Sequence, residues 1–241
     1  MIELKHVTKE FSGGKKAVDD ISCTINDGEI VGFIGPNGAG KTTTIKMITG
    51  VLNPNEGEIL INGINIVKEP LKAKMEFGLV PDQADIFLRL KGIEYLNFIA
   101  DMYEIDGAIR KQRIHDLAET FEMSTALNDR ILSYSHGMRQ KIVIMAVLIC
   151  DPRVWILDEP MTGLDPQSSF RLKEKMREHA NRGNTVFFST HVLEVAEKLC
   201  DKVAIINHGN IVFFGTLEEC KAMHPNSATL EELFLEVVGN A

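Results

Sequence analysis

A glycine-rich segment that ends in Lys-Thr has the composition of a phosphate-binding loop. Residues 35–42 read Gly-Pro-Asn-Gly-Ala-Gly-Lys-Thr and fit the P-loop pattern G-x-x-x-x-G-K-[ST] at every fixed position. Glycine leaves room for main-chain N–H groups to turn toward phosphate oxygens, where a Cβ would obstruct them. The Lys41 ammonium can reach β- and γ-phosphates, and the Thr42 hydroxyl can bind Mg²⁺. The segment therefore predicts a nucleotide site, although a glycine-rich turn can match the pattern by accident.

The sequence on both sides of this loop favours the same interpretation. Residues 29–34 are a short, mostly apolar run without a helical period, which is typical of a buried strand. Residues 43–50 predict a helix that stops at a glycine. The N-terminus of that helix would turn the positive end of its dipole toward the phosphates. The loop residues expected to hold the nucleotide are Asn37, Gly38, Ala39, Gly40, Lys41, Thr42 and Thr43.

Two adjacent carboxylates follow a second apolar run. Residues 154–157 read Val-Trp-Ile-Leu, and Asp158 and Glu159 come directly after them. An aspartate at the end of a buried strand beside a P-loop can hold Mg²⁺, usually through water. Glu159 is then placed to take a proton from an attacking water. The alternative is an ordinary exit from a strand into a loop.

Two further segments carry weaker chemical signals. The pair Thr190-His191 comes just after the predicted strand 185–189, where the His191 imidazole can contact the γ-phosphate and sense its loss. Alternatively, Thr190 caps a helix that begins near Val192. Residues 133–140 read Ser-Tyr-Ser-His-Gly-Met-Arg-Gln and precede a strongly apolar helix. Main-chain N–H groups at such a helix start can bind an anion, although a simple serine cap explains the pattern as well.

Size and composition exclude several classes of protein. The 241 residues include 44% hydrophobic and 25% charged residues, as in ordinary globular proteins. A net charge of −8 argues against a broad nucleic-acid-binding surface, so no nucleic-acid partner is expected. The four cysteines form no C-x-x-C pair, which disfavours a metal site built from cysteine ligands. The longest apolar run, 142–150, is too short to span a bilayer, and the N-terminus resembles no signal peptide, so a cytoplasmic location is expected.

The elements that must position these residues follow from the hydrophobic pattern. Alternation in the first 30 residues predicts antiparallel strands joined by a turn at Gly13-Gly14. From about 92 to 132 the apolar residues recur at helical spacing, which predicts a helical insertion. Apolar runs at 154–157, 185–188 and 203–206, with helices between neighbours, predict a parallel sheet.

These elements predict an α/β fold with one main domain. We expect a P-loop NTPase core with a parallel sheet and flanking helices, an N-terminal antiparallel β-subdomain and an inserted helical subdomain. The domain is expected to span 1–227, with a core lobe at about 1–82 and 134–227 and a helical lobe at about 83–133. A short C-terminal helix is expected within 228–241, because residues 230–237 place apolar residues on one face.

Taken together, these motifs resemble the ATP-binding cassette family, the nucleotide-binding subunits of ABC transporters. The resemblance covers nearly the whole chain and rests on five motifs in family order. They are the P-loop 35–42, Walker B at 154–158 with the catalytic Glu159, the D-loop at Thr162-Gly163-Leu164-Asp165, the switch His191, and Ser135-His136-Gly137-Met138 at the signature position. The pattern Tyr-Ser-x-Gly-Met-x-Gln and the short C-terminal helix resemble the single-domain ATPases of ABC-2-type exporters.

The resemblance implies a head-to-tail dimer with ATP between two subunits. Ser135 and the Gly137 backbone would touch the γ-phosphate held by the partner's P-loop. Mg²⁺ and Lys41 would neutralise phosphoryl charge, while Glu159 would activate water and His191 would hold the γ-phosphate geometry.

Other implied roles are those of an aromatic platform, a ribose or base contact and the D-loop. Phe11 would stack on adenine, unless it is plain strand packing. Val18 would pack on the base or ribose. Asp165 would lie near the dimer interface and help couple the two sites.

The sequence departs from the family pattern at three positions. His136 replaces a signature glycine and Met138 replaces a glutamine, so any need for a positive φ at 136 is not met by glycine. If His136 lines the ATP sandwich, His136→Gly is expected to change turnover or its pH dependence. The family glutamine that follows a proline is also ambiguous, because Asp82 follows Pro81 and Gln83 comes next. Either residue is a candidate contact to Mg²⁺ or water.

The resemblance also implies a membrane permease as a second kind of partner. In the family a short helix of the permease docks in a groove between the core and the helical lobe. The matching segment here is 82–90, where Ile86, Phe87, Leu88 and Leu90 are apolar. We expect Phe87 to be partly exposed and to dock the permease, with the alternative that all four residues belong to the core of the helical lobe.

Alternative functions remain open at this point. A non-transport ABC ATPase usually has two cassettes or long coiled-coil insertions, and this chain has neither. A small-molecule kinase leaves the signature segment unexplained. A regulatory subunit that binds ATP but hardly hydrolyses it is favoured by the atypical signature and disfavoured by Glu159 and His191. The sequence selects no transported substrate, and it does not decide between a homodimer and a pair with a paralogue.

Overall fold

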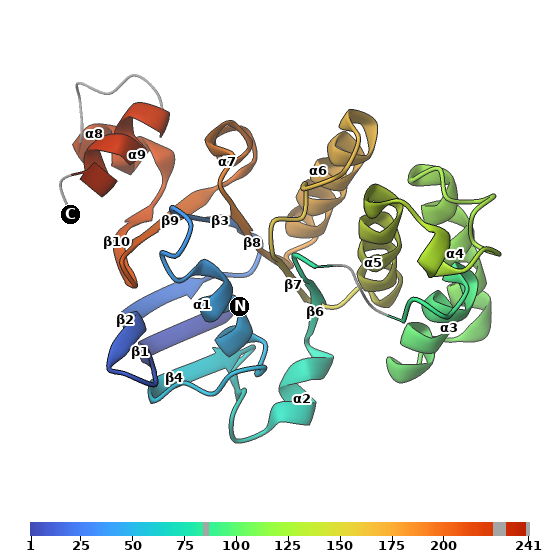
Figure 1. The fold of residues 1–241 in the computed structure, drawn as a ribbon, viewed down its shortest axis with the longest axis horizontal. Coiled ribbons are helices and arrows are strands. Elements are labelled where there is room, and N and C mark those ends of the chain that lie inside the picture. The colour runs from blue at the N-terminus through green and yellow to red at the C-terminus, as the bar shows by residue number, and fades with distance from the viewer. Residues whose placement is uncertain (84–86, 224–229, 240–241) are drawn as a thin grey trace.

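An antiparallel sheet forms one side of the molecule (Figure 1). The computed structural model describes residues 1–83, 87–223 and 230–239. Within this part of the chain the sheet has the strand order β2-β1-β4-β5, so the first two strands form the predicted hairpin and β4 joins on the other side of β1. Its strands are β1 (Ile2–Phe11), β2 (Lys15–Ile25), β4 (Glu56–Ile61) and β5 (Ile64–Asn65).

A second, mostly parallel sheet forms the centre of the molecule. Its strand order is β10-β9-β3-β8-β7-β6 in the described residues, and all neighbours are parallel except the β9–β10 hairpin at the edge. Parallel strands bring their carboxyl ends to one edge, which is where ligands bind in open α/β sheets. The strands are β3 (Ile30–Ile34), β6 (Phe77–Val80), β7 (Val154–Leu157), β8 (Thr185–Thr190), β9 (Lys202–Asn207) and β10 (Asn210–Gly215).

Helices flank the central sheet and extend beyond its β6 edge. Figure 1 shows α3, α4 and α5 grouped at one end of the molecule, with the antiparallel sheet near the other. The helices near the two sheets are α1 (Lys41–Ile48), α2 (Pro70–Met75), α6 (Pro166–Asn181), α7 (Leu193–Leu199), α8 (Leu217–Met223) and α9 (Leu230–Gly239). The group at the far end consists of α3 (Gly92–Met102), α4 (Gly107–Thr120) and α5 (His136–Cys150), with a 3₁₀ turn at Ile131–Ser133.

Helix α5 joins this group to the sheet. Its residues 140–149 are all buried, and a helix that is apolar on every side is stable only inside a core. One hydrophobic cluster runs from Leu96 of α3 and Phe121 through α5 to Trp155 of β7 and Phe188 of β8. The position of the signature segment at the start of α5 is therefore fixed by packing on both sides.

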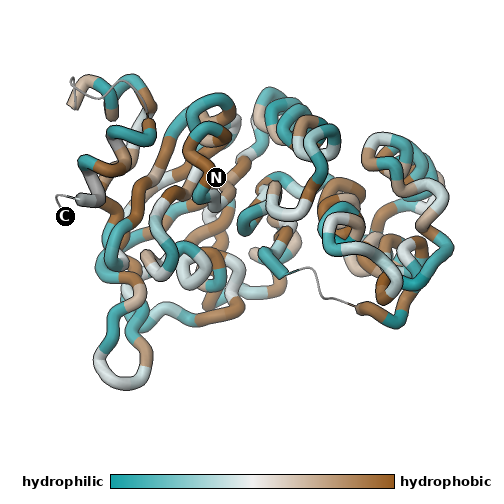
Figure 2. Tube along the Cα trace, turned by 45° about the horizontal axis from the view of Figure 1, so that its top comes forward, coloured by the Kyte–Doolittle hydropathy of each residue, from teal (hydrophilic) through white to brown (hydrophobic). Residues whose placement is uncertain are grey.

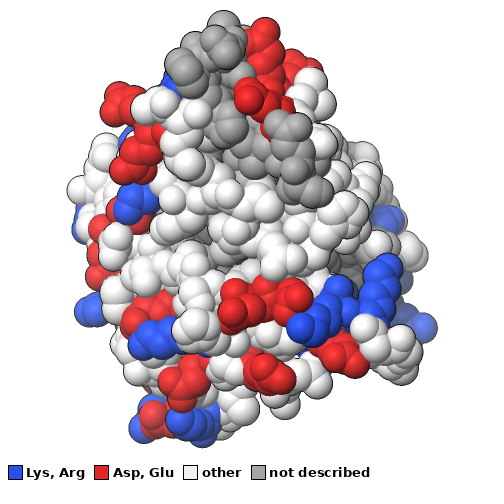
Figure 3. Space-filling view, turned by 90° about the vertical axis from the view of Figure 1, so that its left-hand side faces the viewer, with Lys and Arg blue, Asp and Glu red and all other residues white. Residues whose placement is uncertain are grey.

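Hydrophobic residues follow the strands, and hydrophilic residues mark the outer turns and helices (Figure 2). A second buried cluster lies between the two sheets and under α1, and it includes Val18, Ile45, Phe187 and Ile206. Acidic and basic side chains are interspersed on the face drawn in Figure 3, around a broad uncharged middle.

The predicted fold class is confirmed, including the antiparallel β-subdomain, the parallel sheet and the helical insertion. The sequence interpretation missed β6, α2 and α8, which are only four to seven residues long. Ile86 and part of the tail lie outside the described residues. No described helix is long and apolar enough to cross a bilayer.

Candidate functional site

A cleft of about 580 Å³ opens at the carboxyl ends of the central strands. It lies where the loops after β3 and β7 meet the β1–β2 and β9–β10 hairpins. Most of the predicted P-loop and Walker B residues line it. The predicted residues among its lining are Phe11, Asn37, Gly38, Gly40, Lys41, Thr42, Thr43, Asp82, Asp158 and Glu159.

Two glycines give the P-loop its shape. Gly38 and Gly40 have φ angles of 83° and 115°, a region that side chains rarely adopt. Gly40 also lies against the neighbouring hairpin, because a Cβ built there would be 2.5 Å from the Ala17 carbonyl oxygen. Helix α1 begins at the next residue, so its N-terminal N–H groups face the cleft. The loop is thus a ready anion site.

The Lys41 ammonium bonds its own loop. Its Nζ donates to the Gly35 carbonyl at 2.6 Å and to the Pro36 carbonyl at 3.2 Å. Only 8% of the residue is exposed, and burial lowers the pKa of Lys41, while the carboxylates of Glu159 and Asp158 partly offset that shift. A cation held by two neutral carbonyls keeps most of its charge uncompensated, which favours an anionic ligand such as a phosphate.

Asp158 is a buried carboxylate with hydroxyl partners. The Ser189 hydroxyl donates to its Oδ1 at 2.5 Å, and the main-chain N–H of Glu159 donates to that hydroxyl at 2.9 Å. Burial raises the pKa of Asp158, and hydrogen bonds from Ser189 and Thr42 lower it in part. The nearby charge of Asp82 raises it further. A buried carboxylate beside a hydroxyl offers the oxygen ligands that Mg²⁺ prefers.

Glu159 and His191 face each other across the strand ends. His191 Nδ1 lies 2.9 Å from Glu159 Oε2, and the imidazole is 63% exposed whereas the glutamate side chain is 16% exposed. Glu159 has a φ of 48°, which is unusual for a residue with a side chain and is found where the surrounding fold enforces it. The Thr190 hydroxyl accepts a hydrogen bond from the Val192 N–H at 3.0 Å, but Val192 is itself the N-cap of α7 and the helix has no side-chain cap, so the predicted Thr190 cap is wrong.

Ser135 and Gly137 are not part of this cleft. They lie at the start of α5, where the Ser135 hydroxyl caps the helix by accepting from the Met138 N–H at 3.3 Å. Helix α5 packs within the helical group, away from the P-loop. One chain therefore does not bring the signature segment and the P-loop together.

The structure corrects the role expected of Val18. Its side chain is fully buried and belongs to the cluster under α1, whereas Ala17 lines the cleft. Neighbouring side chains of a strand point to opposite faces, so the side chain that faces the cleft is that of Ala17 and not that of Val18. Val18 is therefore not placed to touch a base or ribose. Ala39 is also buried and does not line the cleft, in contrast to the other predicted loop residues.

The remaining predictions divide between the cleft and its surroundings. Phe11 ends β1 at the rim, and its ring is 44% exposed, so it is available for stacking. Asp82 lines the cleft, whereas Gln83 lines only an adjoining cavity of about 270 Å³ that also reaches Asp158. The sequence interpretation missed four lining residues besides Ala17, namely Lys15, Lys16, His208 and Gly209.

Comparison with known proteins gives consistent results. Residues 18–162 match the family described as ABC transporter. The chain is 38% identical over 222 residues to the ABC transporter ATP-binding protein NatA of Bacillus subtilis, which covers 90% of each chain. It is 36% identical over 216 residues to the linearmycin resistance ATP-binding protein LnrL of the same organism, covering 90% of this chain and 69% of LnrL.

Solved structures agree with these sequence matches. One, described as an ATP-binding subunit of an ABC transporter, superposes with a TM-score of 0.94 at 32% identity and covers 98% of this chain and 99% of its own. Another, a dimeric ATP-binding cassette in a post-hydrolysis state with ADP and phosphate, has a TM-score of 0.82 at 25% identity and covers 90% and 99%.

Proposed function

The chain belongs to the ABC transporter family as an ATP-binding subunit with ATPase activity, and we propose that it hydrolyses ATP between two copies to drive export through a membrane permease. The observation that carries this proposal is the single cleft that joins Lys41, Asp158 and Glu159 to a P-loop. A cation, an oxygen ligand for a metal ion and a general base would all be within reach of one triphosphate chain. Relatives named for drug resistance favour export over import.

The groups in the cleft divide the chemistry of hydrolysis. The P-loop N–H groups and Lys41 would hold the β- and γ-phosphates and stabilise the charge that develops on the transferred phosphoryl group. Glu159 would take the proton of the attacking water, and His191 would hold Glu159 and the γ-phosphate in line. The Phe11 ring would stack on adenine at the rim.

The Thr42 hydroxyl and the Asp158 carboxylate fit Mg²⁺. Asp158 is 4% exposed, and its pKa is raised by burial, so the site holds a carboxylate that gains from a cation. Asp82 adds a second acidic group to the lining of the cleft, and Gln83 lines the adjoining cavity together with Asp82 and Asp158. Mg²⁺ bound here would neutralise phosphate charge.

Ser135 and Gly137 would complete the site of the opposite subunit. In one chain they lie away from the P-loop, yet Ser135 and the N-terminus of α5 are exposed and form an anion-binding surface. A head-to-tail pair of chains would bring this surface to the γ-phosphate held by the other P-loop. A related cassette is dimeric in its post-hydrolysis state, which supports this arrangement.

A permease would dock between the core and the helical lobe. An apolar cleft of about 530 Å³ lies there between α2 and β6 on one side and α3 and α5 on the other. Leu71, Met75 and Met102 line it and are at least half exposed. Phe87 is 51% exposed and packs its ring on Tyr95, which also lines the cleft. The subunit would then lie at the inner face of the cell membrane.

The test of hydrolysis and pairing uses Glu159→Gln. Light scattering of this variant, with and without Mg-ATP, should show a shift from monomer to dimer, because binding persists while the base is lost. Phosphate release should fall by about 10²–10⁴-fold relative to wild type. Lys41→Ala is the control that should neither dimerise nor hydrolyse. A Glu159→Gln chain that binds ATP and stays monomeric would contradict self-pairing and point to a paralogous partner.

The test of docking uses Phe87→Ala in the reconstituted transporter. Basal ATPase of the isolated subunit should be kept, and stimulation by the permease should be lost. Met223→Ala is a matched control, because Met223 is also an exposed apolar residue but lies on α8, far along the chain from the cleft. Unchanged stimulation in Phe87→Ala would contradict a role of Phe87 in docking.

A further inference from the structure

His136 packs against the D-loop of its own chain. It is the first residue of α5, and the D-loop is Thr162–Asp165 between β7 and α6. A Cβ built on Gly163 would lie 2.3 Å from His136 Nδ1 and 2.8 Å from its Cε1. The imidazole therefore occupies the space that any side chain at position 163 would need. Gly163 also has a φ of 77°, so the loop turns sharply at this contact.

The two backbones approach each other at the next residue. A Cβ on Gly137 would lie 2.6 Å from the Gly163 carbonyl oxygen, so glycine is required on this side of the contact as well. The contact is continued one turn further along α5. Lys141 Nζ lies 2.7 Å from Asp165 Oδ2, and Gln140 Nε2 donates to the Pro160 carbonyl at 3.4 Å. One face of α5 thus holds the D-loop at several points.

The C-terminal end of the D-loop is held in place by Asp165. Asp165 caps α6 by accepting from the Ser168 N–H at 2.8 Å, and the Lys141 ammonium and that cap hold the pKa of Asp165 well below its usual range. Gln140 and Lys141 are buried. His136 itself is exposed on the side away from Gly163, so it lies at the outer end of the contact.

We propose that His136 is a positioning residue that fixes the D-loop against the signature turn by filling the space above Gly163. This inference rests on the proposed sandwich, because the signature turn and the D-loop act on the second copy. A glycine at position 136 would leave a gap beside Gly163 and let the loop shift without moving α5. The histidine then acts by its volume and shape rather than by contact with phosphate.

A double-mutant cycle between positions 136 and 163 tests the contact. In the wild-type background Gly163→Ala brings a Cβ into the imidazole, and it also adds the strain of alanine at a positive φ. In the His136→Gly background only the strain remains. We expect the loss of kcat from Gly163→Ala to be at least about threefold smaller in the His136→Gly background, since residues in contact are not additive. Equal losses in both backgrounds would overturn the proposal.

Rescue by shape separates positioning from chemistry. His136→Gly should lower kcat at saturating Mg-ATP by roughly three- to tenfold, below the 10²-fold cost of misplacing a reacting group by 1 Å. KM should change less, because ATP is held mainly by a P-loop, which the substitution leaves unaltered. His136→Phe places a planar ring in the same space and should restore most of kcat. A His136→Phe variant as slow as His136→Gly would show that the imidazole acts chemically, and the proposal would fail.

Two further measurements distinguish failure of the His136–Gly163 contact from failure of the ATP-sandwich dimer. His115→Gly is the matched control, because His115 is an exposed residue of α4, and its kcat should stay near wild type. The same cycle is measured by urea unfolding of the isolated chain, where the contact exists without a partner. If Glu159→Gln fails to dimerise while the unfolding cycle still couples the two positions, the sandwich fails and the contact stands. If unfolding shows additive effects, the contact itself fails.

Discussion

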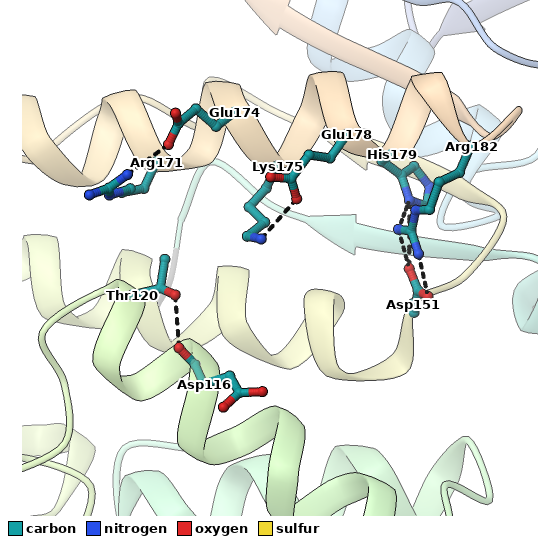
Figure 4. Close-up of polar contacts among 9 residues, drawn as sticks. All are labelled: Asp116, Thr120, Asp151, Arg171, Glu174, Lys175, Glu178, His179 and Arg182. Atoms are coloured by element: carbon teal, nitrogen blue, oxygen red, sulfur yellow. Dashed lines mark hydrogen bonds and ion pairs between the residues drawn. The ribbon is translucent and has the colours of Figure 1, made fainter.

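Asp151 and Asp158 lie at opposite ends of the same short strand, and the fold treats their charges in opposite ways. β7 consists of four fully buried residues, with Asp151 three residues before it and Asp158 directly after it. Arg182 bonds both oxygens of Asp151 at 2.8 and 3.0 Å, and the buried His179 lies 3.6 Å away (Figure 4). His179 and Arg182 hold the pKa of Asp151 well below its usual range.

At the other end the carboxylate has no such compensation. Burial raises the pKa of Asp158, and its partners are hydroxyls rather than cations. Lys41 bonds carbonyls of its own loop and forms no ion pair within the described part of the chain. The amino end of β7 therefore pairs its carboxylate with cations, whereas at the carboxyl end Asp158 and Lys41 form no direct ion pair and remain available to a ligand. Functional sites commonly carry such a local cost.

The largest expected effect comes from neutralising the uncompensated end. Asp158→Asn should lower phosphate release at least about 10²-fold, the scale of losing an electrostatic group in a catalytic site. The free energy of unfolding without ligand should stay within about 1 kcal/mol of wild type or rise, because a buried charge is removed and the Ser189 hydroxyl keeps an acceptor. Urea unfolding measures it, and a clear loss of stability would contradict the contrast.

The next effect comes from the compensated end. Asp151→Asn should lower the free energy of unfolding by about 2 kcal/mol, below the 3–5 kcal/mol of breaking a fully buried pair because the Asp151 side chain is 27% exposed. Phosphate release of the folded protein should stay within about twofold, as Asp151 is remote from the cleft. Thermal and urea unfolding with an ATPase assay check both values. Unchanged stability would show that the Arg182 pair contributes nothing.

The pH dependence of stability should differ in sign between the two ends. Asp151 has a lowered folded pKa, so its stabilisation is present above the unfolded value of about 3.9 and is lost as pH falls toward the folded value. Asp158 has a raised folded pKa, so ionisation destabilises the fold progressively as pH rises from about 3.9 through that value. Unfolding of wild type and the two asparagine variants between pH 3 and 6 measures both differences.

The comparison would fail if the two stability differences changed with pH in the same direction. The wild-type advantage over Asp151→Asn should grow with pH, and the difference from Asp158→Asn should move in the opposite direction. Each asparagine variant serves as the neutral reference for its own position, so other titrating groups cancel. Two differences that move the same way with pH would mean that the two carboxylates occupy equivalent surroundings.

The sequence predicts the contiguous parts of the site well. The P-loop and the pair Asp158-Glu159 each follow directly on a short apolar strand, and the structure brings them together in one cleft. A buried strand fixes where it ends, and the polar residue that follows must lie at the edge of the sheet. The same reasoning predicted His191 after β8, and the structure brings it to Glu159.

The parts that the sequence did not predict depend on contacts between distant segments. His208 and Gly209 reach the cleft because two main-chain hydrogen bonds hold Gly209 there. The Gly209 N–H donates to the Ala39 carbonyl, and the Gly209 carbonyl accepts from the Asp19 N–H, both at 2.9 Å. No local pattern encodes these bonds. Val18 failed for another reason, since a one-residue error in a strand exchanges the buried face for the exposed one. The packing of His136 on Gly163 likewise joins segments that no periodicity connects.

The smallest expected effect concerns His179, which joins the compensated end of β7 to the core. Its ring is fully buried and stacks on Trp155 with 3.9 Å between the ring centroids, and its Nδ1 lies 3.0 Å from an Arg182 nitrogen and 3.6 Å from Asp151 Oδ1. His179→Asn keeps a polar group near the position of Nδ1 but loses the stack, and His179→Phe keeps a stack but loses the polar group. Each should cost about 1 kcal/mol in urea unfolding, the scale of one aromatic pair or one hydrogen bond.

Emission from Trp155, the one tryptophan of the chain, reports the stack directly. It should change in His179→Asn and stay closer to wild type in His179→Phe, with ATPase activity within twofold in both. If instead either variant lowers ATPase activity as strongly as Asp158→Asn does, the two ends of β7 are coupled, and the amino end has a role in turnover beyond holding the strand. Equal stability of both variants and wild type would show that Asp151 and Arg182 suffice without the histidine.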